Sequence, residues 1–94
     1  MSAYQINKLC HRLYRDQAFR EAVKADPATA IADWPLSDPE REALLAGDIK
    51  WLYERGAHPF LLGHINRWDL FGVTPAIYAE RIKGAREPND AHLP

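Results

Sequence analysis

The 94-residue chain has only one cysteine and no cluster of glycines, and these absences exclude several kinds of functional site. Its single cysteine, Cys10, cannot form an internal disulfide, and no CxxC pair offers a zinc site. The five glycines occur singly, so no glycine-rich loop can cradle a phosphate, and no GxSxG motif is present. The sequence therefore excludes a disulfide-stapled fold and the common nucleotide-binding and hydrolase motifs.

Long hydrophobic runs and an excess of charge are also missing. The longest apolar run, residues 59–63, is far too short to cross a bilayer, and the N-terminal segment lacks the pattern of a signal peptide. The 12 Lys and Arg residues stand against 13 Asp and Glu residues, whereas nucleic-acid-binding proteins usually carry a basic excess. We therefore expect a cytoplasmic protein that binds neither membrane nor nucleic acid.

Helix signals recur along the chain, whereas strand-like alternation of apolar and polar residues is nearly absent. One apolar stripe at helical spacing predicts a helix over about residues 2–15; its members are Ile6, Leu9, Cys10, Leu13 and Tyr14. Short polar residues then mark further helix starts, namely Asp16, Asp26, Ser37, Asp48 and Thr74. The pattern predicts an all-α domain over residues 1–84, a compact irregular bundle of five to seven short helices, with a flexible polar tail at 85–94.

The limits of the later helices follow from their caps and from proline and glycine. The predicted helices run over residues 17–24 and 27–33, then from Ser37 to Gly47, from Asp48 to Gly56, from Pro59 to about Trp68, and from Thr74 to Gly84. The carboxylates gather at these helix starts, where capping explains them better than acid–base chemistry.

The histidines do not have the spacing of a metal site within one helix. His58 and His64 are six residues apart, which separates them by about 240° around a helix. His11 follows Cys10 directly, and neighbouring helical residues do not face each other. We expect His58 to cap a helix, the other histidines to be packed or exposed, and the chain to hold neither a metal nor a catalytic residue.

Four large aromatic residues lie within a short stretch around the run GAHPFLLGHINRWDLFGVTP; they are Trp51, Phe60, Trp68 and Phe71. A small domain needs large side chains to build a core, so these residues are one source of core packing. Grouped on the surface instead, they would form an apolar patch that binds a partner. The sequence alone leaves both interpretations open.

Most of the chain resembles a known family. The segments that carry the resemblance are FREAVKADPATAIADW, LSDPEREALLAGDIKWLYERGAHPFLL and GVTPAIYAERIKG, of which residues 43–62 are the most specific. They resemble the small (alpha) subunit of protocatechuate 4,5-dioxygenase, a class III extradiol ring-cleaving enzyme. The resemblance implies a helical accessory subunit without metal, which packs over a large catalytic subunit that carries iron(II) on two histidines and one glutamate.

The chain departs from that family at one place. In the protocatechuate enzymes, an insertion after the helix that corresponds to residues 60–65 carries an aromatic residue that approaches the substrate; this insertion is absent here. The expected lid or partner-binding residues are His58, Pro59, Phe60, His64, Trp68 and Phe71. The expected function is that of a non-catalytic subunit of a dioxygenase acting on a catechol-like or aminophenol-like substrate. The alternative is a stand-alone helical interaction module that self-associates as a homo-oligomer.

Overall fold

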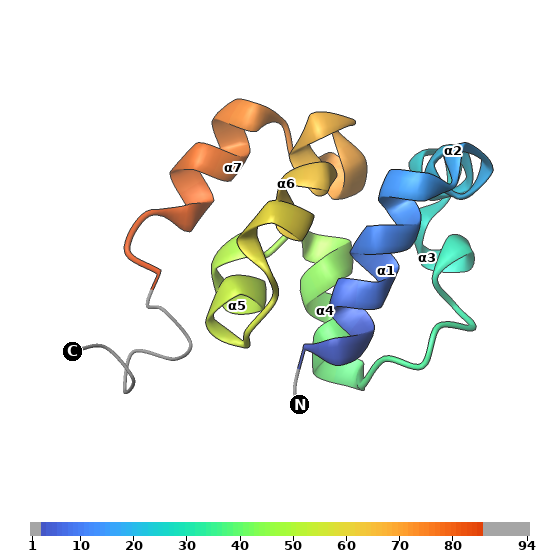
Figure 1. The fold of residues 1–94 in the computed structure, drawn as a ribbon, viewed down its shortest axis with the longest axis horizontal. Coiled ribbons are helices and arrows are strands. Elements are labelled where there is room, and N and C mark those ends of the chain that lie inside the picture. The colour runs from blue at the N-terminus through green and yellow to red at the C-terminus, as the bar shows by residue number, and fades with distance from the viewer. Residues whose placement is uncertain (1–2, 86–94) are drawn as a thin grey trace.

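Short helices account for most of the chain in the computed structural model, which describes residues 3–85. The described residues hold seven α-helices and one 3-10 turn and no strand, as predicted (Figure 1). The helices are α1 (Tyr4–Arg15), α2 (Gln17–Ala25), α3 (Pro27–Ala30), α4 (Asp38–Ala46), α5 (Ile49–Glu54), α6 (Pro59–Arg67) and α7 (Pro75–Ile82), and the turn η1 (Leu70–Gly72) precedes α7. The predicted tail lies outside the described residues, apart from Ala85.

Side-chain caps start most of these helices at the expected residues. The carboxylate of Asp16 accepts a hydrogen bond from the backbone N–H of Phe19 at 3.0 Å, and Thr74 Oγ1 accepts one from Ile77 at 3.2 Å. At α4, Ser37 and Glu40 form a reciprocal capping box. Each cap satisfies an N–H group that has no partner within its helix. The sequence therefore predicted these helix starts correctly.

The third helix is shorter than predicted. It ends at Ala30, and residues 31–33 form a turn instead of continuing to residue 33. The guanidinium of Arg41 donates to the carbonyls of Ile31 at 2.6 Å and Trp34 at 3.0 Å. These carbonyls are thus satisfied from α4, a contact between distant segments that helical periodicity does not reveal.

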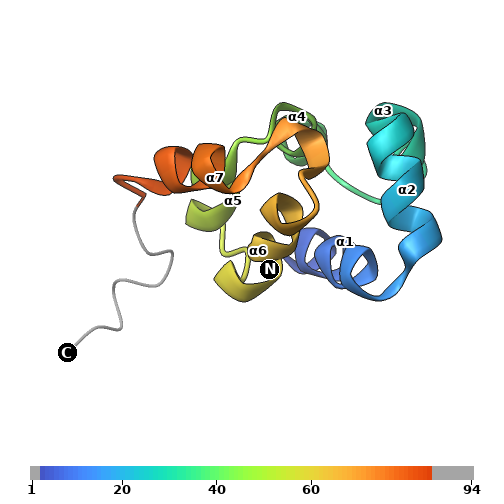
Figure 2. The ribbon, with the colours of Figure 1, turned by 90° about the horizontal axis from the view of Figure 1, so that it is seen from above.

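The core lies where α1 packs along α6, with α4, α5 and η1 closing around them (Figures 1 and 2). Its side chains with no exposed surface include Ile6, Leu9 and Leu13 of α1 and Leu62 and Ile65 of α6. Burying each such side chain contributes roughly 1.5–3 kcal/mol. The two helices are therefore held rigidly side by side, and this fixes the surface that they share.

The two ends of the molecule are built differently. Helices α2 and α3 form one end, and α5 and α7 form the other (Figure 1). At the second end, Arg81 of α7 donates to the carbonyls of Ala46 at 3.1 Å and Gly47 at 2.8 Å, which ties α7 to the end of α4.

Within residues 3–85, no helix combines the length and apolar character that crossing a membrane requires.

Candidate functional site

Helix α6 begins with a histidine cap. His58 Nδ1 accepts a hydrogen bond from the backbone N–H of Phe60 at 3.1 Å, and the His58 backbone N–H donates to Asn7 Oδ1 of α1 at 2.8 Å. Pro59 occupies the first helical position, where its missing N–H costs no hydrogen bond. This arrangement confirms the expected capping role of His58 and directs Phe60 outward, where 70% of its surface is exposed.

Four ring side chains from α1 and α6 form one continuous surface, which we call the aromatic face: Tyr14, Phe60, His64 and Trp68. The His64 ring stacks on Tyr14 with centroids 4.6 Å apart. The Phe60 ring meets His64 edge-on at 5.2 Å, and the ring of Trp68, the residue that directly follows α6, lies 5.7 Å from His64. Residues 60, 64 and 68 follow each other at four-residue spacing, so they share one side of α6.

His64 is the buried centre of this face. Only 3% of its surface is exposed, and its Nε2 atom has no hydrogen-bond partner among the described residues. Burial lowers the pKa of His64 below its ordinary value, and the charges of Arg67, His11 and Arg20 lower it further. The imidazole is therefore held neutral at physiological pH, since a proton would place a charge among other cations.

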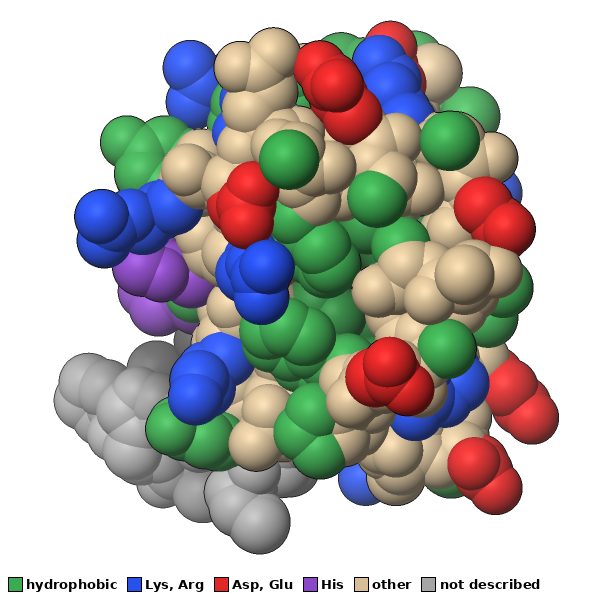
Figure 3. All heavy atoms as spheres, turned by 90° about the vertical axis from the view of Figure 1, so that its right-hand side faces the viewer, with side chains coloured by type: hydrophobic (Ala, Val, Ile, Leu, Met, Phe, Trp, Pro, Cys, Tyr) green, Lys and Arg blue, Asp and Glu red, His purple; other side chains and the backbone are tan. Residues whose placement is uncertain are grey.

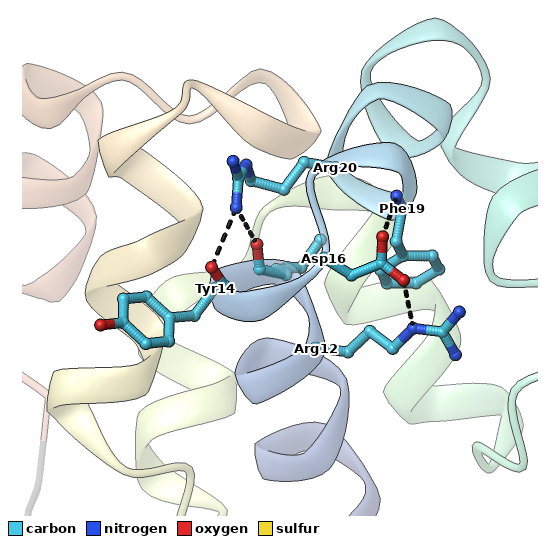
Figure 4. A network of polar contacts seen from close by, with 6 residues as sticks. Arg12, Tyr14, Asp16, Phe19 and Arg20 are labelled. Atoms are coloured by element: carbon cyan, nitrogen blue, oxygen red, sulfur yellow. Dashed lines mark hydrogen bonds and ion pairs between the residues drawn. The ribbon is translucent and has the colours of Figure 1, made fainter.

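Two arginines border the face at Trp68. The guanidinium carbon of Arg20 lies 4.1 Å from the Trp68 ring centroid, and that of Arg67 lies 5.1 Å from it. Arg20 Nη1 also donates to the carbonyls of Leu13 at 2.8 Å and Tyr14 at 2.9 Å, at the end of α1 (Figure 4). Arg20 thus links α2 to α1 and to Trp68 after α6. It also satisfies two backbone carbonyls at the C-terminal end of α1, which have no partner within the helix.

A hollow of about 220 Å³ adjoins Trp68; its lining residues are Gln17, Arg20, Glu21, Lys24, Trp68 and Leu70. A second hollow of about 310 Å³ lies at α4 and α5, lined by Pro39, Glu42, Ala43, Ala46, Asp48 and Trp51. Seen from the α2–α3 end, hydrophobic side chains gather in the middle of the surface, with several Lys and Arg side chains on the side where histidine is visible (Figure 3). The two cations that contact the aromatic face are Arg20 and Arg67, both beside Trp68.

The structure brings together part of the residue set predicted from the sequence. Phe60, His64 and Trp68 are in ring contact, and His58 and Pro59 begin the same helix. Phe71 lies elsewhere: it is 8% exposed and belongs to the core.

One member of the face, Tyr14, and two of its neighbours, Arg20 and Arg67, were not predicted as site residues. Tyr14 was assigned to the apolar stripe of α1, yet 48% of its surface is exposed. For Arg67, proximity to Trp68 along the chain was an available signal. Arg20 approaches Trp68 only through the tertiary fold, so the sequence held no comparable signal for it.

The described residues offer no set of groups for metal or nucleophilic chemistry. No three His, Cys, Asp or Glu side chains within residues 3–85 come close enough to share a metal ion, and so these residues do not fit the iron(II) of ring-cleaving enzymes. His92 lies outside the described residues. Burial raises the pKa of the Cys10 thiol to about 12, which keeps it protonated and unreactive.

Comparison with known proteins identifies the family. Residues 6–87 match the family described as "Aromatic-ring-opening dioxygenase LigAB, LigA subunit". No curated protein and no solved structure shows significant similarity to the chain. The match covers most of the chain, including both helices that carry the aromatic face. The chain therefore belongs to the LigA subunit family of aromatic-ring-opening dioxygenases.

Proposed function

We propose that this chain is the non-catalytic small subunit of a heteromeric extradiol dioxygenase, in which it packs on a large LigB-type catalytic subunit and covers its active site. The partner would carry the iron(II) and act on a catechol-like or aminophenol-like substrate. Membership of the LigA family supports this role. The aromatic face supports it further, because it is a surface suited to burial against another protein.

The exposure of the Phe60 side chain is the observation that best supports the proposal. Its ring is 70% exposed although it lies against the buried His64 ring, so the chain alone leaves a large apolar group in water beside a packed cluster of rings. Aromatic side chains on such surfaces supply much of the binding energy of protein interfaces. Arg20 and Arg67 beside Trp68 provide the polar rim that such interfaces usually have.

The rigidity of the face suits it to act as a lid. His64 is clamped between Tyr14 and α6, and Arg20 is fixed by two carbonyls, so few side chains need to lose freedom on docking. A rigid apolar cover excludes water from the site beneath it, and this strengthens the electrostatic interactions there. In this proposal His58 and Pro59 extend the cover at the start of α6, whereas Phe71, a core residue, takes no part in it.

The affinity of the chain for a recombinant LigB-type subunit from the same source tests the proposal. We expect Phe60→Ala to weaken binding by at least about tenfold, the usual effect of removing an interface anchor. Folding should be preserved, since Phe60 is largely exposed. Tyr4→Ala is the matched control, because Tyr4 is 61% exposed but lies beside Lys8 at the other end of α1.

Titration calorimetry gives the affinity, and ring-opening activity of the catalytic subunit with and without the chain gives the functional consequence. The proposal predicts that the chain raises this activity and that Phe60→Ala reduces the effect. Absence of binding between the unmodified proteins, with no change in activity, would overturn it. A stable homo-oligomer that buries the aromatic face would favour the self-associating module instead.

A further inference from the structure

Arg20 lines the hollow beside Trp68, and its guanidinium lies over the Trp68 ring. Both carbonyls that Arg20 binds are reached by the same atom, Nη1. No other group in the described part of the chain accepts a hydrogen bond from its Nε or Nη2 atom. The Nε–Nη2 edge of arginine matches the two oxygens of a carboxylate. The side chain is thus fixed in place with its carboxylate-binding edge unused.

The hollow that Arg20 lines carries excess positive charge. Lys24 lies one helical turn further along α2 and lines the same hollow, and it forms no ion pair with any described carboxylate. The hollow's one acidic residue, Glu21, accepts a hydrogen bond from Gln17 Nε2 at 3.0 Å and is not paired with either cation. Two cations and one engaged carboxylate leave a net charge of +1 without a counter-ion among the described residues.

From this geometry we infer that the hollow between α2 and the α6–η1 corner receives an Asp or Glu side chain of the catalytic subunit. The carboxylate binds the Nε–Nη2 edge of Arg20, and Lys24 supplies a second positive charge. The inference rests on the proposed function and deepens it, since it states the chemistry of the partner surface. Because Arg20 is already fixed, forming this ion pair costs little side-chain entropy.

Size and position favour a side chain of the partner over a free small molecule. The volume of about 220 Å³ lies below the roughly 300–1,000 Å³ of pockets that enclose small ligands. Trp68 lines the hollow and also belongs to the aromatic face, so a protein that covers the face reaches the hollow without a gap. An acidic residue at the rim of an apolar contact is then complementary to this surface in both charge and shape.

Charge reversal at Lys24 tests the inference without disturbing the fold, because Lys24 is exposed and makes no described contact with a carboxylate. We expect Lys24→Glu to weaken binding of the LigB-type subunit by about tenfold at low salt. The loss should shrink as salt is added, since screening weakens the repulsion that the new carboxylate introduces. Lys50→Glu is the control: it makes the same charge change on exposed α5, at the other end of the molecule (Figure 1).

Zero-length cross-linking identifies the partner's chemical group directly. A water-soluble carbodiimide joins a carboxylate to an amine that touches it, forming an amide and passing the lost water to the reagent. We expect mass spectrometry of the treated complex to find Lys24 joined to an Asp or Glu of the catalytic subunit. Lys24→Arg keeps the charge but removes the reactive amine, so it should retain affinity and lose the cross-link.

The outcomes separate this inference from the proposed function. Binding that Lys24→Glu and Lys50→Glu weaken equally, or a complex without a cross-link at Lys24, overturns the carboxylate site and leaves the small-subunit role standing. Failure of the unmodified chain to bind the catalytic subunit overturns both.

Discussion

His64 combines burial, ring stacking and an unpaired nitrogen in a single side chain. Its neighbours come from three helices: Tyr14 and His11 from α1, Arg20 from α2, and Arg67 from its own helix α6. Every charged group that shifts its pKa is a cation or a potential cation. Protonation of His64 therefore adds positive charge to a place that already repels it.

This arrangement makes a pH-dependent contribution to stability. Because the pKa of His64 is below 6.5 in the folded chain, the unfolded chain binds a proton first as the pH falls. The neutral side chain contributes fully above pH 6.5, and stability is lost below it with a slope of at most about 1.4 kcal/mol per pH unit. We expect His64→Phe, which keeps a ring in place, to remove this component from the pH profile.

Urea unfolding of both proteins between acidic and neutral pH measures the effect. The difference in the free energy of unfolding between wild type and His64→Phe should change in favour of the variant as the pH falls. Two profiles that run parallel over this range would contradict the prediction, because His64 would then titrate alike in the folded and unfolded chains.

At the scale of the elements, the end of α4 is the most tightly constrained junction. Gly47 has a φ of +69°, and a Cβ added there would lie 2.6 Å from Val73 Cγ2 and 2.8 Å from Arg81 Nη1. We expect Gly47→Ala to lower the free energy of unfolding by about 2–4 kcal/mol, from left-handed backbone strain together with overpacking against Val73 and against Arg81 of α7. Thermal or urea denaturation measures the loss.

Gly63 provides the matched control for that substitution. It lies inside α6, and an added Cβ would have no atom within 4 Å apart from its chain neighbours and the backbone of its own helix. There, Ala should stabilise the chain by about 0.5–1 kcal/mol, because it lowers the backbone entropy of the unfolded state. Equal effects of the two substitutions would show that the contacts of Gly47 with α7 do not constrain this junction.

The elements also show how far the sequence alone predicts this fold. Local signals gave the helix starts at Asp16, Ser37 and Thr74, because a cap involves only the next three residues. They did not give the early end of α3, which depends on Arg41 ten residues beyond Ile31. Nor did they give the left-handed backbone of Phe71, which has a φ of +54° inside η1.

The contacts of the candidate site are likewise of two kinds: those that the sequence predicts and those that only the tertiary fold creates. The spacing of Phe60, His64 and Trp68 along α6 was visible in the sequence, since residues four apart share one side of a helix. The contacts of Tyr14 with His64 and of Arg20 with Trp68 were not, because they form only when α1 and α2 pack beside α6. Long-range packing thus decides which of the aromatic residues form a surface and which, like Phe71, join the core.

At the scale of the whole molecule, the charge of the described surface favours one of the two assemblies considered for this chain. A symmetric dimer built on the aromatic face would place the same patch against itself. Such a dimer would bring two copies each of Arg20, Arg67 and Lys24 into one interface, and these like charges repel one another. A catalytic subunit that presents a carboxylate meets no such penalty.

We therefore expect the isolated chain to be monomeric at low and moderate salt, with a mass close to 10.7 kDa in sedimentation velocity across the micromolar range. High salt screens the repulsion and should permit weak self-association through Phe60, which Phe60→Ala removes. Addition of the catalytic subunit should convert the monomer to a complex already at low salt. A dimer that is stable at low salt and lost in Phe60→Ala would contradict this expectation, because apolar contact would then outweigh the repulsion between like charges.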